Sequence, residues 1–360
     1  MADASSFSPD YPAARARFLA AAHAAGWAVE RHGIGVVGPD GDELTLDVAR
    51  RGPERPARVV VASSGLHGVE GFLGSAIQCA FLEEELEGRV FPDDVAVVLV
   101  HGLNPYGFAY HRRVNENSVD LNRNFLLDGE QFVGSPARYG GLDGLLNPRT
   151  PPPSFELFLP RALATIARYG LPALKDAVAG GQYDFPKGLF YGGDGPQRTQ
   201  EILRDNLGRW IGPAAHRVLH LDFHSGLGAR GTYKLLVDHA AGSPGADVLF
   251  RAFGPNVQPW AANGVSYAIR GGLGTWCKAR FPRVEYDVLA AEFGTVPILK
   301  VIAALRAENR AHHWGDPASP ETRTAKERCR DTFAPPDIAW RTSVAQDGVA
   351  LVLKALEACS

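Results

Sequence analysis

Cysteine and methionine are both scarce in this chain, whose 360 residues include four cysteines and one methionine. The cysteines, Cys79, Cys277, Cys329 and Cys359, lie far apart and form no C-x-x-C pair. Such isolated cysteines indicate reduced thiols in a cytoplasmic chain, and they exclude a disulfide framework.

Charge of one sign and long apolar runs are also missing. The formal net charge is −3, and no Lys/Arg-rich run is present, so a nucleic-acid partner or a membrane-surface partner is not expected. The longest uninterrupted apolar run covers only residues 95–100, far short of a membrane span. The first residues contain no continuous apolar segment and therefore do not resemble a secretory signal.

What the chain does have is an alternation of short β-branched runs with longer segments of helical pattern. The expected strands are residues 43–48, 57–63, 95–102, 217–224, 233–238 and 286–294. The expected helices are residues 11–26, 73–87, 159–179, 197–210, 296–312 and 343–358. This order predicts the α/β class, a three-layer sandwich in which helices cover both faces of a mixed, mainly parallel sheet.

The domain prediction is one catalytic domain over residues 1–360, with loop insertions near 126–160 and 180–196. Both insertions are rich in Gly and Pro but carry apolar and aromatic residues, which favours ordered loops over linkers. The sequence GIGVVG at 33–38 fits the dinucleotide fingerprint G-x-G-x-x-G. It continues into a turn and a second strand, and not into a helix, so a β-hairpin explains it better.

Three of the expected strands end in residues that could do chemistry. His67 and Glu70 form an H-x-x-E pair after the first, His224 ends the second, and Glu292 lies at the end of the third. An H-x-x-E pair alone is weak, because a chain with 11 His readily contains one by chance. Ligands of α/β sheets bind at the carboxyl ends of strands, and three N/O ligands with a nearby carboxylate base are what a catalytic zinc site requires.

The polar segment 104–125 lies between these strand ends and carries Arg112, Arg113 and Arg123. A solvated surface loop is one interpretation of it. The other is substrate binding, because Asn122 and Arg123 stand side by side and combine an amide donor with a planar guanidinium, a pairing suited to a carboxylate.

Six motifs in this order resemble those of the zinc carboxypeptidase superfamily. The resemblance is to the carboxypeptidase A type, and more closely to an uncharacterised bacterial branch related to succinylglutamate desuccinylase and aspartoacylase. The motifs are H-x-x-E (67–70), N-P-x-G-F (104–108), D-L-N-R-N (120–124), F-H-S (223–225), Y-x-x-x-G-G-x-x-x-W (267–276) and E-F-G (292–294).

The resemblance implies a site with one Zn²⁺ ion, held by His67, Glu70 and His224. It further implies that Asp120 accepts the free N–H of His67 and so fixes its tautomer. Glu292 is implied as general base and then general acid. Beside a dication and two arginines, Glu292 is expected to be ionised at neutral pH.

The substrate residues are also implied by the resemblance. Asn122 and Arg123 would hold a terminal carboxylate, and Tyr267 would close over the substrate. Arg113, or alternatively Arg112, would polarise the scissile carbonyl; the spacing leaves the choice between the two open.

Aromatic residues of the second insertion could shape the pocket, although packing is the expected role of any one of them. These residues are Tyr183, Phe185, Phe190 and Tyr191. Arg270 lies close to the position that resembles the specificity site of carboxypeptidases, and it could favour an acidic group.

The expected function is zinc-dependent hydrolysis of an amide bond next to a free carboxylate. The first hypothesis is a carboxypeptidase-like exopeptidase acting on short peptides or peptide-like amides in the bacterial cytoplasm. The alternatives are an N-acyl amino acid deacylase, similar to desuccinylase and aspartoacylase, and a zinc-binding module without catalysis. An intact Glu292 argues against the last of these.

Overall fold

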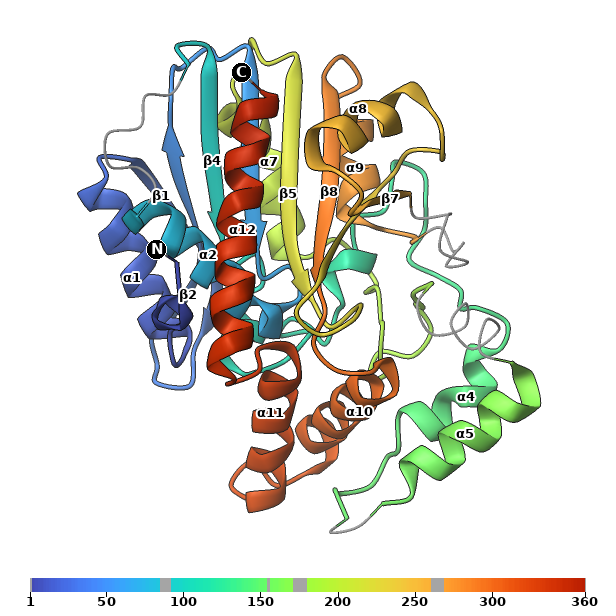
Figure 1. Ribbon diagram of the computed structural model, residues 1–360. Helices are drawn as coiled ribbons and strands as arrows, with labels where there is room; N and C mark the ends of the chain where they lie inside the picture. Colours follow the sequence, from blue (N-terminus) through green and yellow to red (C-terminus); the bar gives the residue numbers. More distant parts are fainter. Residues whose placement is uncertain (1, 85–91, 154–155, 171–179, 260–268, 360) are drawn as a thin grey trace.

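A computed structural model describes residues 2–84, 92–153, 156–170, 180–259 and 269–359 (Figure 1). Eight of its strands form one sheet in the order β1-β2-β4-β3-β5-β8-β6-β7. Their bounds are β1 Ala28–Val37, β2 Glu43–Arg51, β3 Arg58–Ser64, β4 Val95–His101, β5 Arg217–Ser225, β6 Tyr233–Val237, β7 Val257–Pro259 and β8 Glu285–Phe293.

The sheet is mixed, as predicted. The pairs β3–β4, β3–β5, β5–β8 and β6–β7 are parallel, and the remaining three pairs are antiparallel. All six predicted strands are present to within a few residues at each end, while β1 and β7 were not predicted. The GIGVVG sequence lies in β1, which pairs with β2 as an antiparallel hairpin, so the β-hairpin prediction is confirmed.

Helices lie on both faces of the sheet, which confirms the three-layer α/β prediction (Figure 1). The helices are α1 Tyr11–Ala24, α2 Gly71–Glu84, α3 Pro105–Ala109, α4 Tyr139–Leu146, α5 Phe158–Tyr169, α7 Arg198–Ile211, α8 Pro244–Phe253, α9 Leu273–Arg280, α10 Ile298–Trp314, α11 Pro320–Phe333 and α12 Ile338–Ala358. Short 3-10 turns are η1 Ala4–Ser6, η2 Gly68–Glu70 and η3 Leu121–Arg123.

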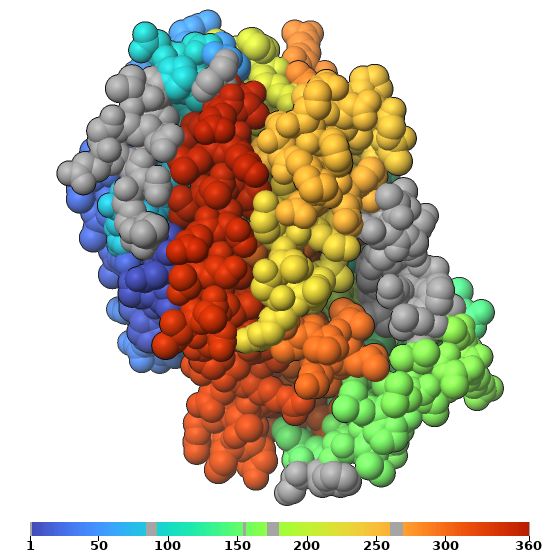
Figure 2. Space-filling view, viewed as in Figure 1, coloured from blue at the N-terminus to red at the C-terminus, as the bar shows by residue number. Residues whose placement is uncertain are grey.

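One apolar core joins one sheet face to α1, α2, α8 and α12, and a second joins the other face to α7 and α9. Figure 2 shows α12 between the N-terminal elements and the segment around α8. Because helices cover both faces, the central strands β3 and β4 are buried along nearly their whole length, which explains their continuous β-branched sequence. No described helix has the length and apolar character needed to cross a bilayer.

Helix ends follow local sequence signals. Asp10 accepts a hydrogen bond from the backbone N–H of Ala13 at 2.8 Å and begins α1, and Asp337 caps α12 through the N–H of Trp340 at 2.7 Å. The first insertion contains α4 and the start of α5, and its Glu156 bonds to two arginines of α10. The four cysteines are buried and none forms a disulfide.

Candidate metal centre

The H-x-x-E pair lies on a turn that directly follows β3. Gly65 turns the chain with φ +68°, and residues 68–70 form η2. The N–H groups of Gly68 and Val69 donate to the carbonyls of Arg113 and Arg112. A Cβ at Gly68 would lie 2.2 Å from the backbone of Gly107, so only glycine allows this close approach. The turn is therefore fixed against segment 104–113.

Three side chains from this turn and from β5 converge in a buried cluster. His67 Nδ1 lies 3.0 Å from Glu70 Oε1, His224 Nδ1 lies 3.0 Å from Glu70 Oε2, and the two Nδ1 atoms are 3.3 Å apart. The three residues are at most 4% exposed. The backbone N–H of Ser225 also donates to Glu70 at 3.1 Å.

These distances fit a tetrahedral cation. Ligand atoms about 2.0–2.1 Å from a tetrahedral zinc ion lie about 3.3 Å from one another, close to the separations of 3.0–3.3 Å found here. Two imidazole nitrogens facing each other at this distance need a proton or a cation between their lone pairs. The donor set of two nitrogens and a carboxylate is one that suits zinc.

The charges of the cluster depend on one another. Burial raises the pKa of Glu70, but the charges and hydrogen bonds of His67 and His224 outweigh it and hold that pKa well below its usual range. Burial lowers the pKa of His224, yet the Asp222 carboxylate raises it well above the usual value. A proton or a cation that lies between Glu70 and the two histidines is therefore strongly stabilised.

A carboxylate stands behind each imidazole. Asp120 Oδ1 lies 3.3 Å from His67 Nε2, and Asp222 Oδ2 lies 2.6 Å from His224 Nε2. Each carboxylate can accept an N–H at Nε2 and so leave Nδ1 for a metal. The sequence predictions named Asp120 but not Asp222; the D-x-H spacing on β5 is the signal that identifies Asp222.

The two neighbouring arginines have different environments. Arg113 lies in the cluster: Nε donates to Asp120 at 3.0 Å, and Nη2 is 2.6 Å from His67 Nε2. Arg112 is fully buried and donates to Glu308 at 2.9 Å. The guanidinium of Arg112 is used in a buried ion pair of the core, which favours Arg113 over Arg112 as the residue that would contact substrate.

Glu292 lies beside His224 in the parallel pairing of β5 and β8. Burial raises its pKa, and so does Glu70, while His224, His67 and Arg113 lower it; the net value is about 7. The sequence prediction of a fully ionised Glu292 presumed a dication beside it. The protein groups alone leave this carboxyl between its two protonation states near neutrality.

The predicted carboxylate-binding pair lies in η3. Asn122 Oδ1 accepts the N–H of Leu273 at 3.1 Å, which ties η3 to the start of α9. Arg123 is 4% exposed, and Tyr183 OH donates to its carbonyl at 2.8 Å. Gly271 lies so close that a Cβ there would be 2.2 Å from the Arg123 carbonyl oxygen. Tyr267 lies outside the described residues.

The second insertion contacts Arg113 and Arg270. Arg113 lies over the Phe190 ring at 5.5 Å, and Phe190 has φ +62°, a conformation rare for a bulky residue. Arg270 stacks on Tyr183 at 4.6 Å and donates to the carbonyls of Gln131 and Val133. Arg270 therefore fixes a loop, which argues against the suggestion that it selects an acidic group.

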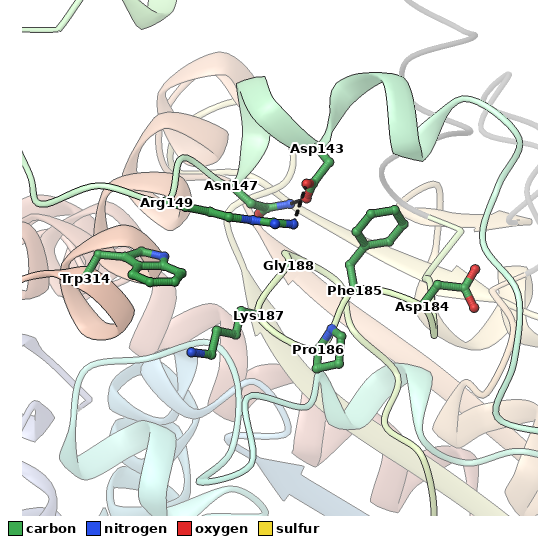
Figure 3. Close-up of a pocket in the computed structure, with 9 residues that line it drawn as sticks. All are labelled: Asp143, Asn147, Arg149, Asp184, Phe185, Pro186, Lys187, Gly188 and Trp314. Atoms are coloured by element: carbon green, nitrogen blue, oxygen red, sulfur yellow. Dashed lines mark hydrogen bonds and ion pairs between the residues drawn. The ribbon is translucent and has the colours of Figure 1, made fainter.

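A separate hollow of about 320 Å³ lies beside the same insertion (Figure 3). Residues 184–188 line it together with Trp314, and Lys187 lies 4.8 Å from the Trp314 ring. Arg149 and Asp143 form a 3.0 Å ion pair on its other wall. Its lining shares no residue with the His–Glu–His cluster.

Fold and site together define an α/β protein with a buried His–Glu–His cluster of metal-binding type. Comparison of the sequence with protein families then assigns it: a profile described as protein of unknown function (DUF2817) matches residues 7–347, and the chain belongs to that family. No curated protein sequence matches the chain.

Solved structures that are similar to this one include a carboxypeptidase A from Helicoverpa armigera, with 12% identity and a TM-score of 0.46 over 92% of this chain and 75% of that one. A succinylglutamate desuccinylase/aspartoacylase family protein from Shewanella amazonensis has 17% identity and a TM-score of 0.38 over 78% and 72%. The murein-tripeptide amidase of Escherichia coli O157 has 18% identity and a TM-score of 0.37 over 79% and 92%.

Proposed function

We propose that this protein is a zinc-dependent hydrolase that cleaves an amide bond next to a free carboxylate. The observation that supports the proposal best is the convergence of His67, Glu70 and His224. The ligand atoms of all three face one point, and each side chain is also in contact with a further residue that holds it in place. Cytoplasmic location and one ion per chain are part of the same proposal.

His67, Glu70 and His224 would hold the ion. Bound there, Zn²⁺ would supply Lewis-acid chemistry, which polarises a carbonyl and lowers the pKa of water. Arg113 would donate to the carbonyl oxygen as negative charge develops on it, a contribution that is strongest in a buried site.

Glu292 would move the proton. A carboxylate beside His224 can accept a proton from water and then donate it to the leaving amine. Asn122 and Arg123 would orient the substrate through its carboxylate, with Tyr183 and Gly271 holding the backbone of Arg123 in place.

Two substrate classes share the amide and the carboxylate: short peptides with a free C-terminus, and N-acyl amino acids. We favour the peptides, and the deacylase is the alternative. The test incubates zinc-loaded protein with both classes and with C-terminally amidated peptides, and analyses the products by mass spectrometry. Release of C-terminal residues from free peptides only would support the proposal. Turnover of N-acyl amino acids alone would establish the deacylase, and no turnover of either class would leave a zinc-binding module.

A further inference from the structure

A line of polar side chains runs from the cluster into the sheet, on the face that α7 and α9 cover. His220, Asp222 and His224 alternate along β5 and so point to the same side. Ser63 of β3 pairs with Asp222 in the sheet register, and Tyr286 of β8 lies on the same side. All five are at most 3% exposed.

Their polar atoms form one continuous chain of hydrogen bonds. Asp222 Oδ2 lies 2.6 Å from His224 Nε2, and Asp222 Oδ1 accepts from Ser63 Oγ at 2.6 Å. Ser63 Oγ lies 2.8 Å from His220 Nε2, and His220 Nδ1 lies 3.0 Å from Tyr286 OH. No water is needed to satisfy these groups, because each one has its partners.

The contacts fix where each proton lies. An ionised carboxylate only accepts, so both His224 Nε2 and Ser63 Oγ donate to Asp222. The single proton of Ser63 is then used, and His220 Nε2–H must donate to it. Burial lowers the pKa of His220 to about 4, so its other nitrogen carries no proton at neutral pH and accepts from Tyr286 OH.

We infer that Ser63, His220 and Tyr286 are positioning residues for the metal site, acting through Asp222 on His224. Every donor in the chain points toward Asp222, so each of its two carboxylate oxygens accepts a hydrogen bond and the carboxylate holds His224 in the Nε2–H tautomer. That tautomer presents the Nδ1 lone pair to Glu70 and His67, where the ion would bind. The inference rests on the proposed metal site.

If Ser63 and His220 had only a structural role, replacing Ser63 would lower stability without weakening Zn²⁺ binding. The chain contains a matched serine–histidine pair that serves as the control. Ser75 Oγ lies 2.9 Å from His101 Nε2, and both residues are buried. This serine–histidine pair has the same chemistry as Ser63 and His220 but contacts no residue of the cluster in the contacts described. Replacing Ser75 therefore measures the cost of losing a buried hydroxyl.

The experiment compares Ser63→Ala with Ser75→Ala. Zn²⁺ affinity is measured by competition with a chromogenic chelator, and Tm is measured on the metal-free proteins. Loss of a group that orients a ligand directly costs about 10- to 100-fold in affinity; one step further out we expect roughly 3- to 10-fold for Ser63→Ala. Ser75→Ala should lower Tm similarly and leave the Zn²⁺ Kd unchanged.

Tyr286→Phe gives a second test that does not depend on folding of the serine variant. It removes only the distal hydroxyl and should weaken Zn²⁺ in the same direction, by less. Tyr139→Phe, which removes another buried hydroxyl, at 2.6 Å from the Leu189 carbonyl, is its control. An unchanged Kd in both Ser63→Ala and Tyr286→Phe would overturn the inference while leaving the metal site intact; wild-type protein that takes up no Zn²⁺ would overturn the proposed function itself.

Discussion

Nη2 of Arg113 lies 2.6 Å from Nε2 of His67, and Asp120 Oδ1 lies 3.3 Å from the same nitrogen. Arginine can only donate and a carboxylate can only accept. Nε2 therefore satisfies Asp120 when it carries a proton and Arg113 when it does not. If Nδ1 of His67 binds a metal, Nε2 carries the proton and Asp120 becomes its partner. We therefore expect zinc loading to release Arg113 from His67.

Crystal structures of the protein grown with and without Zn²⁺ would test this. The Arg113–His67 separation should increase from 2.6 Å to beyond the hydrogen-bonding limit of about 3.5 Å, while Asp120 stays in contact. A released guanidinium is free to meet a substrate carbonyl. If zinc-loaded crystals keep the short Arg113–His67 contact, Arg113 is not available for that role.

Replacing each of the two neighbouring arginines should have different effects on kcat. Arg113→Ala should lower kcat by about 10²–10³-fold, because it removes a donor aimed at developing charge. It should also lower Tm, because buried Asp120 loses a partner at 3.0 Å. Arg112→Ala removes the 2.9 Å partner of buried Glu308, which keeps Lys326 at 3.1 Å, and should cost about 3 kcal/mol of stability. Kinetics corrected for the folded fraction, together with thermal melts, separate the two. Equal loss of kcat in folded Arg112→Ala would return that residue to the site.

Glu292→Gln should abolish most turnover and keep the metal. Loss of a general acid–base group costs about 10²–10⁴-fold, and the amide preserves the volume of the side chain. Since the base must be ionised, kcat/KM should fall as pH decreases through the pKa of Glu292. The protein groups hold that pKa at about 7, and a bound dication would lower it, so the acidic limb is expected below pH 7. Unchanged turnover in a zinc-replete Glu292→Gln variant would exclude this residue as the base.

Gly271 should be needed for substrate binding although it carries no side chain. Its φ is +71°, and a Cβ would meet the carbonyl oxygen of Arg123 at 2.2 Å, so Gly271→Ala must displace η3. We expect a raised KM for substrates with a free carboxylate. Gly254→Ala is the matched control, because Gly254 has φ +85° and no atom within 4 Å of the added Cβ. An equal KM effect of both changes would point to general destabilisation.

The sequence was sufficient to predict that the candidate metal ligands and the candidate base lie at the ends of strands. His67, Glu70, His224 and Glu292 each stand where an apolar run stops, and the parallel strands bring three such ends to one edge of the sheet. Tautomer control by Asp222 was harder to predict, because a carboxylate two residues before a histidine on a buried strand equally fits a core ion pair.

The choice between Arg112 and Arg113 could not be made from the sequence. The ion-pair partner of Arg112 is Glu308, which lies 196 residues further along the chain. Only folding brings these two residues together. The same holds for Phe190, whose left-handed backbone and contact with Arg113 come from the folding of the insertion. The six predicted helices correspond to α1, α2, α5, α7, α10 and α12, whereas α3, α4, α8, α9 and α11 were not predicted.

His101 provides a test of the fold away from the site. It is fully buried, stacks on Phe18 at 4.5 Å, and burial lowers its pKa to about 3. The unfolded chain has a histidine pKa of about 6.5, so it binds a proton before the folded protein does. This histidine therefore leaves stability unaffected well above pH 6.5 and lowers it as pH falls from 6.5 toward 3.

Between pH 7 and pH 5 the loss from this one group should be about 2 kcal/mol. His101→Phe keeps a ring against Phe18 and removes the titration. It also leaves Ser75 without its partner, a cost that is the same at both pH values. Urea unfolding of the wild type and the variant at pH 7 and pH 5 should therefore show their stability difference shifting by about 2 kcal/mol in favour of His101→Phe at the lower pH. A difference that does not change with pH would mean that the folded protein accommodates a protonated His101, and that the packing between α1 and β4 is looser than described.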